Sequence, residues 1–431
     1  MATDTIRRPG PRAWMTIAFA MFAVGWGANQ FSPMLIVYRH ELRLTSGEVA
    51  ALFLVYALTL IPGLLVGGPV SDRFGRRPVV WPFVALSPVA TLLFVLGPRS
   101  LAMIAAGRAL GGLCSGVVFG SATAWVQEVS PSEGSSARRA ALALTAGFGL
   151  GPVVAAGLAQ WAPDPLVTPY LPHLVIGAAA AAAVGRTPER SAAPGRTPVT
   201  AATPGGSGAR RARTGPRRWP AAAVRTRGFW LAVAPASPLV FGSVALAIVV
   251  LPEEVTSAGS LSAGFAGLMT VLSFAAGVAV QPWGRRRRDP LTGAVAGLAC
   301  GTAGAAVGIA AVAGPDRVLA GVAAVLLGLA YGLCLVSGLR QVEHLAAPDE
   351  RGAVAACYYA LAYTGFALPY LVTGLGAAAG KAGAFVALTA IIAALMLGLA
   401  GHAARLREPA RPGPADTTPG RQARDRRSVT R

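Results

Sequence analysis

Apolar stretches long enough to cross a lipid bilayer recur along almost the whole chain of 431 residues, and they constrain its fold more than any other feature. A transmembrane helix needs about 20 mostly apolar residues, because the hydrocarbon core is about 30 Å thick. We count twelve such stretches, at about 13–38, 48–71, 78–97, 101–127, 139–161, 168–185, 228–252, 262–284, 290–313, 318–342, 352–378 and 382–404. We therefore expect an all-α membrane protein with twelve transmembrane helices.

The charges are few and unevenly placed. Only 13% of the residues are charged, against about 25% in soluble domains. A net charge of +20 is also found in nucleic-acid-binding proteins. A cytoplasmic N-terminus, however, places 32 of the 38 Lys and Arg residues in cytoplasmic segments and five in outer loops, as the positive-inside rule requires. We expect a multi-pass protein in the lipid bilayer of a plasma membrane, with both termini cytoplasmic and no nucleic-acid partner.

Almost all of the basic residues are arginine, and alanine and glycine abound. This composition is typical of GC-rich bacterial genomes, so we expect the membrane to be a bacterial plasma (inner) membrane.

Two segments differ in composition from the apolar stretches. Residues 186–227 are rich in Pro, Gly, Ser, Thr and Arg, and cannot bury a core. We expect a disordered basic cytoplasmic linker there, between a six-helix half at 1–185 and a second at 228–404. Residues 405–431 have a similar composition and are expected to form a disordered basic cytoplasmic tail.

The two groups of six stretches are weakly similar to each other. Glu128 and Glu343 each stand at the end of an apolar stretch and lead into a short acidic-then-basic turn. Gly112-Leu113-Cys114 also loosely matches Gly332-Leu333-Cys334. Such a repeat indicates two parallel six-helix halves, related by an axis along the membrane normal.

The most informative motif connects the second and third stretches. It reads Gly68-Pro69-Val70-Ser71-Asp72-Arg73-Phe74-Gly75-Arg76-Arg77-Pro78. Gly68 and Asp72 are four residues apart, so they share a helix face at the cytoplasmic end. We expect Gly68 to allow close helix approach. Asp72 is expected to pair with the arginines, or to accept from a neighbouring helix N-terminus, in a contact that holds in one conformation and breaks in another.

This segment resembles the signature loop of the major facilitator superfamily, in which Gly-x3-Asp-Arg-x-Gly-x-Arg-Arg lies between the second and third helices. The matching residues are Gly68, Asp72, Arg73, Gly75, Arg76 and Arg77. The resemblance implies two six-helix halves that rock about a central cavity, with this loop as a cytoplasmic latch. The second-half counterpart, 284–289, keeps the charge but loses the Gly-x3-Asp spacing. The fold needs no partner chain, so we expect a monomer.

Arg108 lies inside the fourth stretch, about seven residues from its start. A buried arginine in a membrane helix is costly, which makes it a candidate functional residue. Its position resembles the family's Arg-x3-Gly motif, which is implicated in proton coupling. The alternative is an arginine that snorkels to the interface or pairs structurally. Gly112, Gly116 and Gly120 follow at four-residue intervals and predict a close-packing helix face.

The fifth stretch contains Gly147, Gly151 and Pro152. They match a Gly-x3-Gly-Pro-x2-Gly-Gly motif of the family's exporter (antiporter) branches, although alanines replace the paired glycines at 155–156. Pro152 removes a backbone donor and kinks the helix, and the glycines allow tight packing against a neighbour. Kinked packing without any meaning for transport direction is the alternative.

A polar cluster in the first stretch contains Trp26, Asn29 and Gln30. Amide groups in hydrocarbon need partners, so we expect Asn29 and Gln30 to face the central cavity. Aromatic residues including Tyr331 and Tyr363 are candidates for its walls, and the alternative for each is packing against lipid or core.

No Asp or Glu lies near the middle of a stretch. Proton-coupled exporters often carry such a carboxylate, because burial brings its pKa toward working pH. If protons drive this protein, the carrier is unusual; Glu128, Glu343 and His173 lie only near the ends of stretches. The absence favours neutral or anionic substrates over cations.

These features predict a secondary transporter that moves a small organic molecule by alternating access, and we expect proton-linked efflux. Uptake of a sugar or carboxylate is the first alternative, and a non-transporting sensor or scaffold the second. No nucleophile motif, metal cluster, Walker loop or dinucleotide fingerprint is present in the sequence. We therefore expect no enzymatic activity, no cofactor and no metal.

Overall fold

The structure is a computed structural model that describes residues 13–129, 133–187, 222–256, 262–347 and 350–407. The described residues are almost entirely helical, as expected for an all-α membrane protein. Most of the expected linker, 186–227, and tail, 405–431, lies outside the described residues, so the boundaries of the halves stay predictions.

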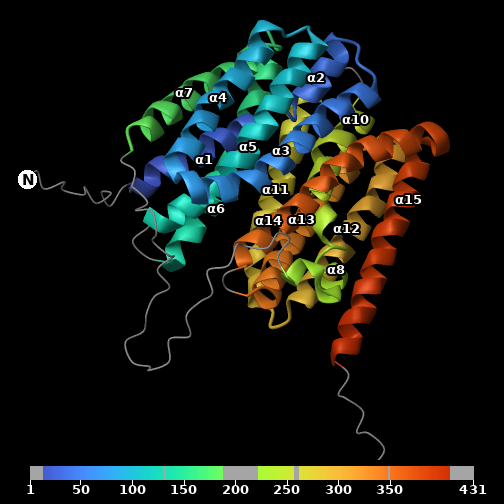
Figure 1. Cartoon of the computed structure of the whole chain (residues 1–431). Coiled ribbons are helices and arrows are strands. Elements are labelled where there is room, and N and C mark those ends of the chain that lie inside the picture. The colour runs from blue at the N-terminus through green and yellow to red at the C-terminus, as the bar shows by residue number, and fades with distance from the viewer. Residues whose placement is uncertain (1–12, 130–132, 188–221, 257–261, 348–349, 408–431) are drawn as a thin grey trace, which may run out of the picture.

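The N-terminal half is drawn from blue to green in Figure 1. Its helices are α1 (Ala13–Asn29), α2 (Met34–Glu41), α3 (Ser46–Phe74), α4 (Arg76–Leu96), α5 (Leu101–Val129), α6 (Glu133–Trp161), η1 (Thr168–Tyr170) and α7 (Leu171–Gly185).

The C-terminal half is drawn from yellow-green to red in Figure 1. Its helices are η2 (Ala222–Arg225), α8 (Arg227–Ala232), α9 (Ser237–Ala245), η3 (Leu246–Val250), α10 (Leu251–Val255), α11 (Ser262–Arg286), α12 (Pro290–Ala313), α13 (Arg317–Leu345), α14 (Arg351–Thr364), η4 (Gly365–Ala367) and α15 (Leu368–Arg407). Its first span is irregular and contains the π-helical segment η3.

Ten helical segments of the described chain are individually long and apolar enough to cross a membrane. The first expected span falls short because it is divided between α1 and α2. The last two spans are merged in one segment, which turns at Gly380, where φ is +75°; such a value suits glycine because it has no Cβ. All twelve expected spans are therefore present.

Polar caps explain where several helices begin. The Thr45 hydroxyl accepts from the backbone N–H of Glu48, whose carboxylate accepts in turn from the Thr45 N–H. Asp289 and Asp316 cap α12 and α13 in the same way, by accepting from the first backbone N–H groups. Each cap satisfies donors that a helix N-terminus leaves free.

Glycines bring helix backbones together at equivalent places in the two halves. A Cβ at Gly112 or Gly116 would collide with carbonyl oxygens of α3, so α5 lies directly against that helix. A Cβ at Gly328 or Gly332 would collide in the same way with carbonyl oxygens of α11. The predicted close-packing face is confirmed for α5, and the match between Gly112 and Gly332 reflects the same packing in each half.

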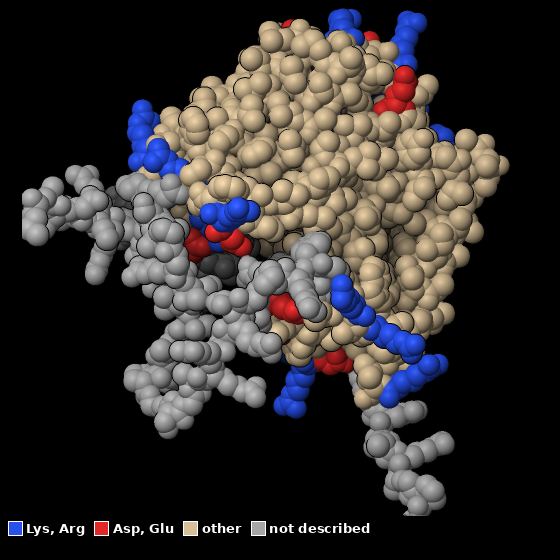
Figure 2. All heavy atoms as spheres, in the orientation of Figure 1, with Lys and Arg blue, Asp and Glu red and all other residues tan. Residues whose placement is uncertain are grey.

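Charged side chains gather at the two ends of the helix bundle, and the face shown in Figure 2 has an uncharged belt between them. One end carries Gly75 and the basic run 285–288; the charge count predicts that it faces the cytoplasm, and we call it the inner end. The opposite end, which carries α2, is the outer end.

We predict that Gly116→Ala lowers the stability of the protein, because its Cβ would overlap the carbonyl oxygen of Leu60. Overpacking of this kind costs about 1–3 kcal/mol. Gly149→Ala is the matched control, since a Cβ there meets nothing within 4 Å. Thermal unfolding in detergent measures both, and equal melting temperatures for the two variants would contradict the packing argument.

Candidate functional site

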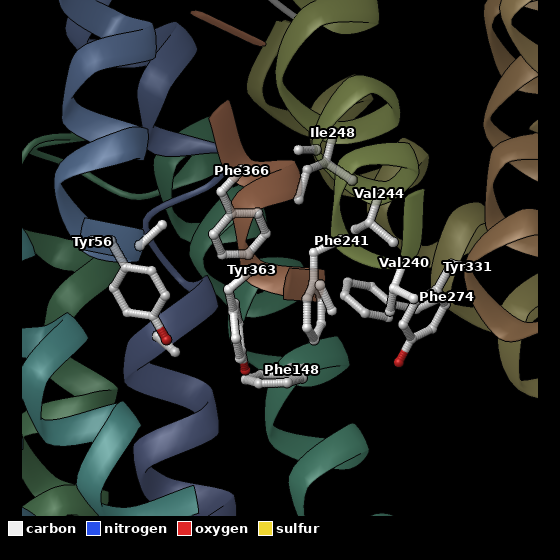
Figure 3. Close-up of a cluster of buried hydrophobic side chains, with 14 of the residues drawn as sticks. Tyr56, Phe148, Val240, Phe241, Val244, Ile248, Phe274, Tyr331, Tyr363 and Phe366 are labelled. Carbon is white, nitrogen blue, oxygen red and sulfur yellow. The ribbon is translucent and has the colours of Figure 1, made fainter. Parts of the chain in front are cut away.

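Aromatic side chains from both halves meet in the middle of the bundle (Figure 3). Phe366 of η4 lies 4.7 Å from Phe53 of α3 between ring centroids, and 5.5 Å from Phe241 of α9. Tyr56 approaches the same ring at 6.1 Å. Phe366 therefore connects the N-terminal half to the aromatic side chains of the C-terminal half.

A second part of the cluster contains the two predicted tyrosines. Tyr363 stacks on Phe241 with a centroid distance of 4.2 Å, and Tyr331 packs edge-on against Phe274 at 5.6 Å. Phe274 in turn lies 6.4 Å from Phe148 of α6, which closes the cluster back onto the N-terminal half. Sequence reasoning missed Phe241, Phe274 and Phe148, because an isolated Phe in an apolar helix has no signal that separates a cavity wall from a lipid-facing side chain.

Six of these rings line a small cavity, whereas Phe53 and Tyr331 do not, so Tyr331 is not the cavity wall that the sequence suggested. The lining residues of the cavity are Asn29, Tyr56, Phe148, Phe241, Val244, Ile248, Phe274, Tyr363 and Phe366. The space available to a water-sized sphere is about 10 Å³, roughly what a single water molecule needs. In this conformation the cavity is too small for an organic substrate, and its lining is aromatic and aliphatic apart from one amide and two phenol groups.

Arg108 lies beside this cavity and is 3% exposed. Its guanidinium is 4.4 Å from the ring centroids of both Phe31 and Tyr56. Nε donates to the carbonyl of Leu52 (3.2 Å), and Nη1 donates to the carbonyl of Ala28 (3.3 Å). The charge is thus held by aromatic faces and backbone carbonyls. The snorkelling alternative is wrong for this structure, because the guanidinium is buried.

The carbonyl of Ala28 is available because α1 ends one residue later. In a continuous helix it would accept from the N–H of Ser32, but that N–H bonds the carbonyl of Asn29 instead (3.0 Å). A free carbonyl in the membrane needs a partner, and Arg108 supplies one. The arginine therefore stabilises the break between α1 and α2.

The three residues of the predicted polar cluster, at the end of α1 and just after it, point in different directions. Asn29 lines the cavity as expected, and its Nδ2 lies 3.5 Å from the carbonyl of Phe148. Gln30 does not: its Nε2 donates to Thr91 of α4 (3.0 Å), and the side chain is fully buried. The expectation that Gln30 faces the cavity is wrong in this structure. Successive residues at a helix end point to different sides, and α4 offers a hydroxyl.

Trp26 does not line the cavity either; it packs against α6. A Cβ at Gly147 or Gly151 would collide with the backbone of α1 at residues 22–26, so these glycines let α6 lie directly on α1. Pro152 follows within α6. The predicted tight packing of this motif is confirmed, and its neighbour is α1, the helix that carries the break.

The signature loop is tied together within the N-terminal half. Gly75, with φ of +98°, separates α3 from α4. Arg76 pairs with Asp72 (2.7 Å) and with Glu128 of α5 (2.8 Å), and Arg77 donates to the carbonyl of Gly185 at the end of α7. Asp72 thus pairs with a loop arginine, one of the two expected options.

Arg73 and Gly68, the other two matched residues of the loop, make few contacts in this conformation. Arg73 is exposed, and its guanidinium lies 5.3 Å from the Phe74 ring centroid. A Cβ at Gly68 would meet nothing within 4 Å, whereas one at Gly63 or Gly67 would press against α5. Close approach in this conformation therefore depends on Gly63 and Gly67, and the expected role of Gly68 is not seen.

Comparison with known protein families decides the class of the protein. The sequence model of the Major Facilitator Superfamily matches residues 16–299. The chain belongs to the major facilitator superfamily. A solved structure of the nucleoside transporter NupG (D323A mutant) superposes with a TM-score of 0.65 at 11% identity, over 90% of this chain and 99% of that one. That likeness confirms the twelve-helix major facilitator fold.

Curated relatives match over short stretches. Quinolone resistance protein NorA of Staphylococcus aureus (strain MRSA252) is 26% identical over 144 residues, which are 33% of this chain and 37% of the relative. Multidrug resistance protein D of Escherichia coli (strain K12) is 34% identical over 98 residues, 22% of this chain and 25% of the relative. The chain thus aligns with only 25–37% of the length of these relatives.

In this major facilitator protein, side chains also join the two halves at the outer end. Arg39 of α2 forms an ion pair with Glu253 of α10. Nearby, Gln160 of α6 accepts from the backbone N–H of Gly264 on α11 (3.1 Å). These two contacts join the halves at the outer end. Sequence reasoning missed this ion pair, because the two residues are 214 positions apart, on short helices without a motif.

We predict that Asp72→Asn lowers the transport rate severalfold without impairing membrane insertion. The Asp72 side chain is 44% exposed, so its ion pair with Arg76 contributes less than about 1 kcal/mol to the stability of this conformation. A lower transport rate in the variant would therefore come from a contact that Asp72 makes in another conformation. Asp316→Asn is the control, because Asn caps a helix as well as Asp does. Wild-type rates in Asp72→Asn would remove the latch function.

We predict that Arg39→Gln opens the outer side. In a variant with Ile248→Cys in the cavity, labelling by a membrane-impermeant thiol reagent from outside should rise about two- to fivefold, as expected for losing a partly exposed pair worth about 0.5–1 kcal/mol. Lys381→Gln is the control, since Lys381 pairs with Glu254 within the C-terminal half. Equal labelling in both variants would argue against an outer closure held by Arg39.

Proposed function

We propose that this protein exports small amphipathic organic molecules that are neutral or anionic and carry an aromatic group, in exchange for protons. The observation that carries the proposal is the aromatic cluster shared by the two halves around the central cavity. Flat rings in a substrate can stack on such aromatic walls in several orientations. Rocking of one half against the other enlarges this cavity on one side at a time.

The charges near the cavity support this choice of substrate. No carboxylate belongs to the described lining of the cavity, whereas Arg108 lies behind Tyr56, one of its walls. A buried positive charge held only by carbonyls and ring faces favours an anion, or the negative end of a dipole, over a cation. The Asn29 amide adds one hydrogen-bonding group to an otherwise apolar surface.

The direction of transport rests on two supports. Gly147, Gly151 and Pro152 resemble the motif of exporter branches, and the matched relatives include proteins named for quinolone and multidrug resistance. Uptake of a metabolite is the second candidate: Asn29 and Arg108 would then bind its hydroxyl and carboxylate groups. The same residues serve either direction, so transport assays have to separate the two.

The test is transport by the purified protein in liposomes with an imposed pH gradient, using matched aromatic carboxylates, neutral aromatics and aromatic amines. We expect movement of the first two classes toward the acidic side, accompanied by opposite proton movement. Preference for the amines would overturn the substrate class. Movement of a sugar or aliphatic carboxylate with the protons would establish uptake instead.

We predict that Phe241→Ala weakens apparent substrate affinity about tenfold, equivalent to about 1.4 kcal/mol, because it removes the ring on which Tyr363 stacks. Phe19→Ala is the matched control, since Phe19 is exposed on the outside of α1. Counterflow of radiolabelled substrate measures both, and an equal change in the two variants would mean that the ring cluster has no special part in binding.

We predict that Arg108→Lys lowers transport at least tenfold although it keeps the charge. A lysine ammonium lacks the planar fork that reaches two carbonyls while lying between two rings. Arg340→Lys, at the inner end of α13, is the comparison: its guanidinium also donates to backbone carbonyls. Near-wild-type transport by Arg108→Lys would show that charge alone is sufficient.

A further inference from the structure

A buried polar network that has no part in the cavity lies between α1, α4 and α7. His173 of α7 is fully buried, and its Nδ1 is 2.7 Å from the Thr91 hydroxyl oxygen. That hydroxyl accepts from Nε2 of Gln30 (3.0 Å). The Ser87 hydroxyl lies 3.5 Å from His173 Nε2, and the ring also hydrogen-bonds the backbone of Ala23.

The donors and acceptors of this network define the state of the histidine. Because Gln30 donates to the Thr91 oxygen, the single hydroxyl hydrogen of Thr91 is free to donate to Nδ1 of His173. The ring nitrogen Nε2 then carries the hydrogen and donates to the carbonyl of Ala23. The arrangement suits a neutral imidazole, and it leaves Oε1 of Gln30 buried without a hydrogen-bond partner among the described residues.

A proton on Nδ1 would reverse the chain of hydrogen bonds. The ring would then donate to the Thr91 oxygen, which leaves the Thr91 hydroxyl hydrogen free to turn toward Gln30. Gln30 can accept only if its amide turns and presents Oε1, the atom that has no partner now. The network therefore has two arrangements, one for neutral and one for protonated His173, and the Gln30 amide is turned between them.

Gln30 lies where a turn of its amide can affect the end of α1. It is the first residue after α1, next to Asn29, which lines the cavity. Two residues earlier, Ala28 accepts from Arg108. A turn of the Gln30 amide thus acts on the backbone that holds both the cavity amide and the buried arginine.

We propose that His173 is the site that binds the transported proton, and that Gln30 relays its protonation to the break between α1 and α2. The proposal rests on the proton-linked transport proposed above and supplies its carrier. It also accounts for the absence of an acidic residue in the middle of the membrane helices, because the histidine binds the proton in place of a carboxylate.

The elements packed around His173 leave few other titrating groups. Neither α1 nor the membrane part of α4 has an ionisable side chain. The segment η1 contributes Tyr170, whose hydroxyl is 2.8 Å from that of Tyr38. The remaining charge is Arg108, which reaches α1 from α5. A proton on His173 would repel that guanidinium, so the two positive charges oppose each other across the same stretch of α1.

The test compares coupled and uncoupled transport in His173→Gln, with His344→Gln as the control because His344 is exposed at the inner end. The probe is the aromatic carboxylate that the wild-type protein transports fastest and that does not titrate between pH 5.5 and 8. We expect substrate counterflow by His173→Gln to stay within about twofold of the wild-type rate. The substrate-driven proton flux should fall at least tenfold.

The pH dependence has a definite sign. In an exporter that exchanges substrate for protons, the neutral histidine belongs to the substrate-bound form. Wild-type protein should therefore bind the probe more tightly at pH 8 than at pH 5.5, and His173→Gln should bind it equally at both. Unchanged proton flux and unchanged pH dependence in His173→Gln would overturn the proposal while leaving proton-linked export intact.

Two further results are decisive. If the wild-type protein moves the probe without any proton flux, proton linkage itself fails and the assignment of His173 fails with it. If His173→Gln does not fold, Thr91→Val and Thr91→Ser replace it, because the serine keeps the relaying hydroxyl and the valine removes it. Coupling retained only in Thr91→Ser supports the relay, and equal coupling in both contradicts it.

Discussion

A polar group inside a lipid bilayer needs a partner from the protein, and the central part of this structure follows from that requirement. The break after Asn29 frees the carbonyl of Ala28, and Arg108 fills the vacant bond. The arginine is itself tolerated because two carbonyls and three ring faces surround it. The broken helix and the buried charge therefore depend on each other, and neither would be stable in the membrane alone.

Glycines give the helices their positions around this centre. Since lipid is as apolar as leucine, membrane helices associate through close contact and not through the hydrophobic effect. Gly112 and Gly116 place α5, with Arg108, directly on α3, while Gly147 and Gly151 place α6 on α1. Arg108 thus reaches Ala28 because its own helix and the broken helix are both fixed by backbone contact.

Much of this architecture was predictable from the sequence. Length and apolarity located all twelve spans, and four-residue spacing identified the glycine faces on α5 and α6, because both signals are local and repeat along a helix. The orientations of single polar residues were not predictable: Gln30 turns to Thr91 because α4 happens to offer a hydroxyl there. Contacts between the halves, such as Arg39 with Glu253, depend on packing between distant segments that no local pattern records.

Because charge is scarce inside the bundle, each buried polar group has a large effect on the electrostatic energy of its neighbours. In a low-dielectric interior, one added proton changes the energies of neighbouring charges and dipoles far more than it does in water. Here Arg108 and the His173 network act on the same short segment of α1, which is already broken and so can shift without unravelling a continuous helix. In the proposed coupling, this helix break would be the element with two states, and its neighbour Asn29, which lines the cavity, would carry the change to the cavity wall.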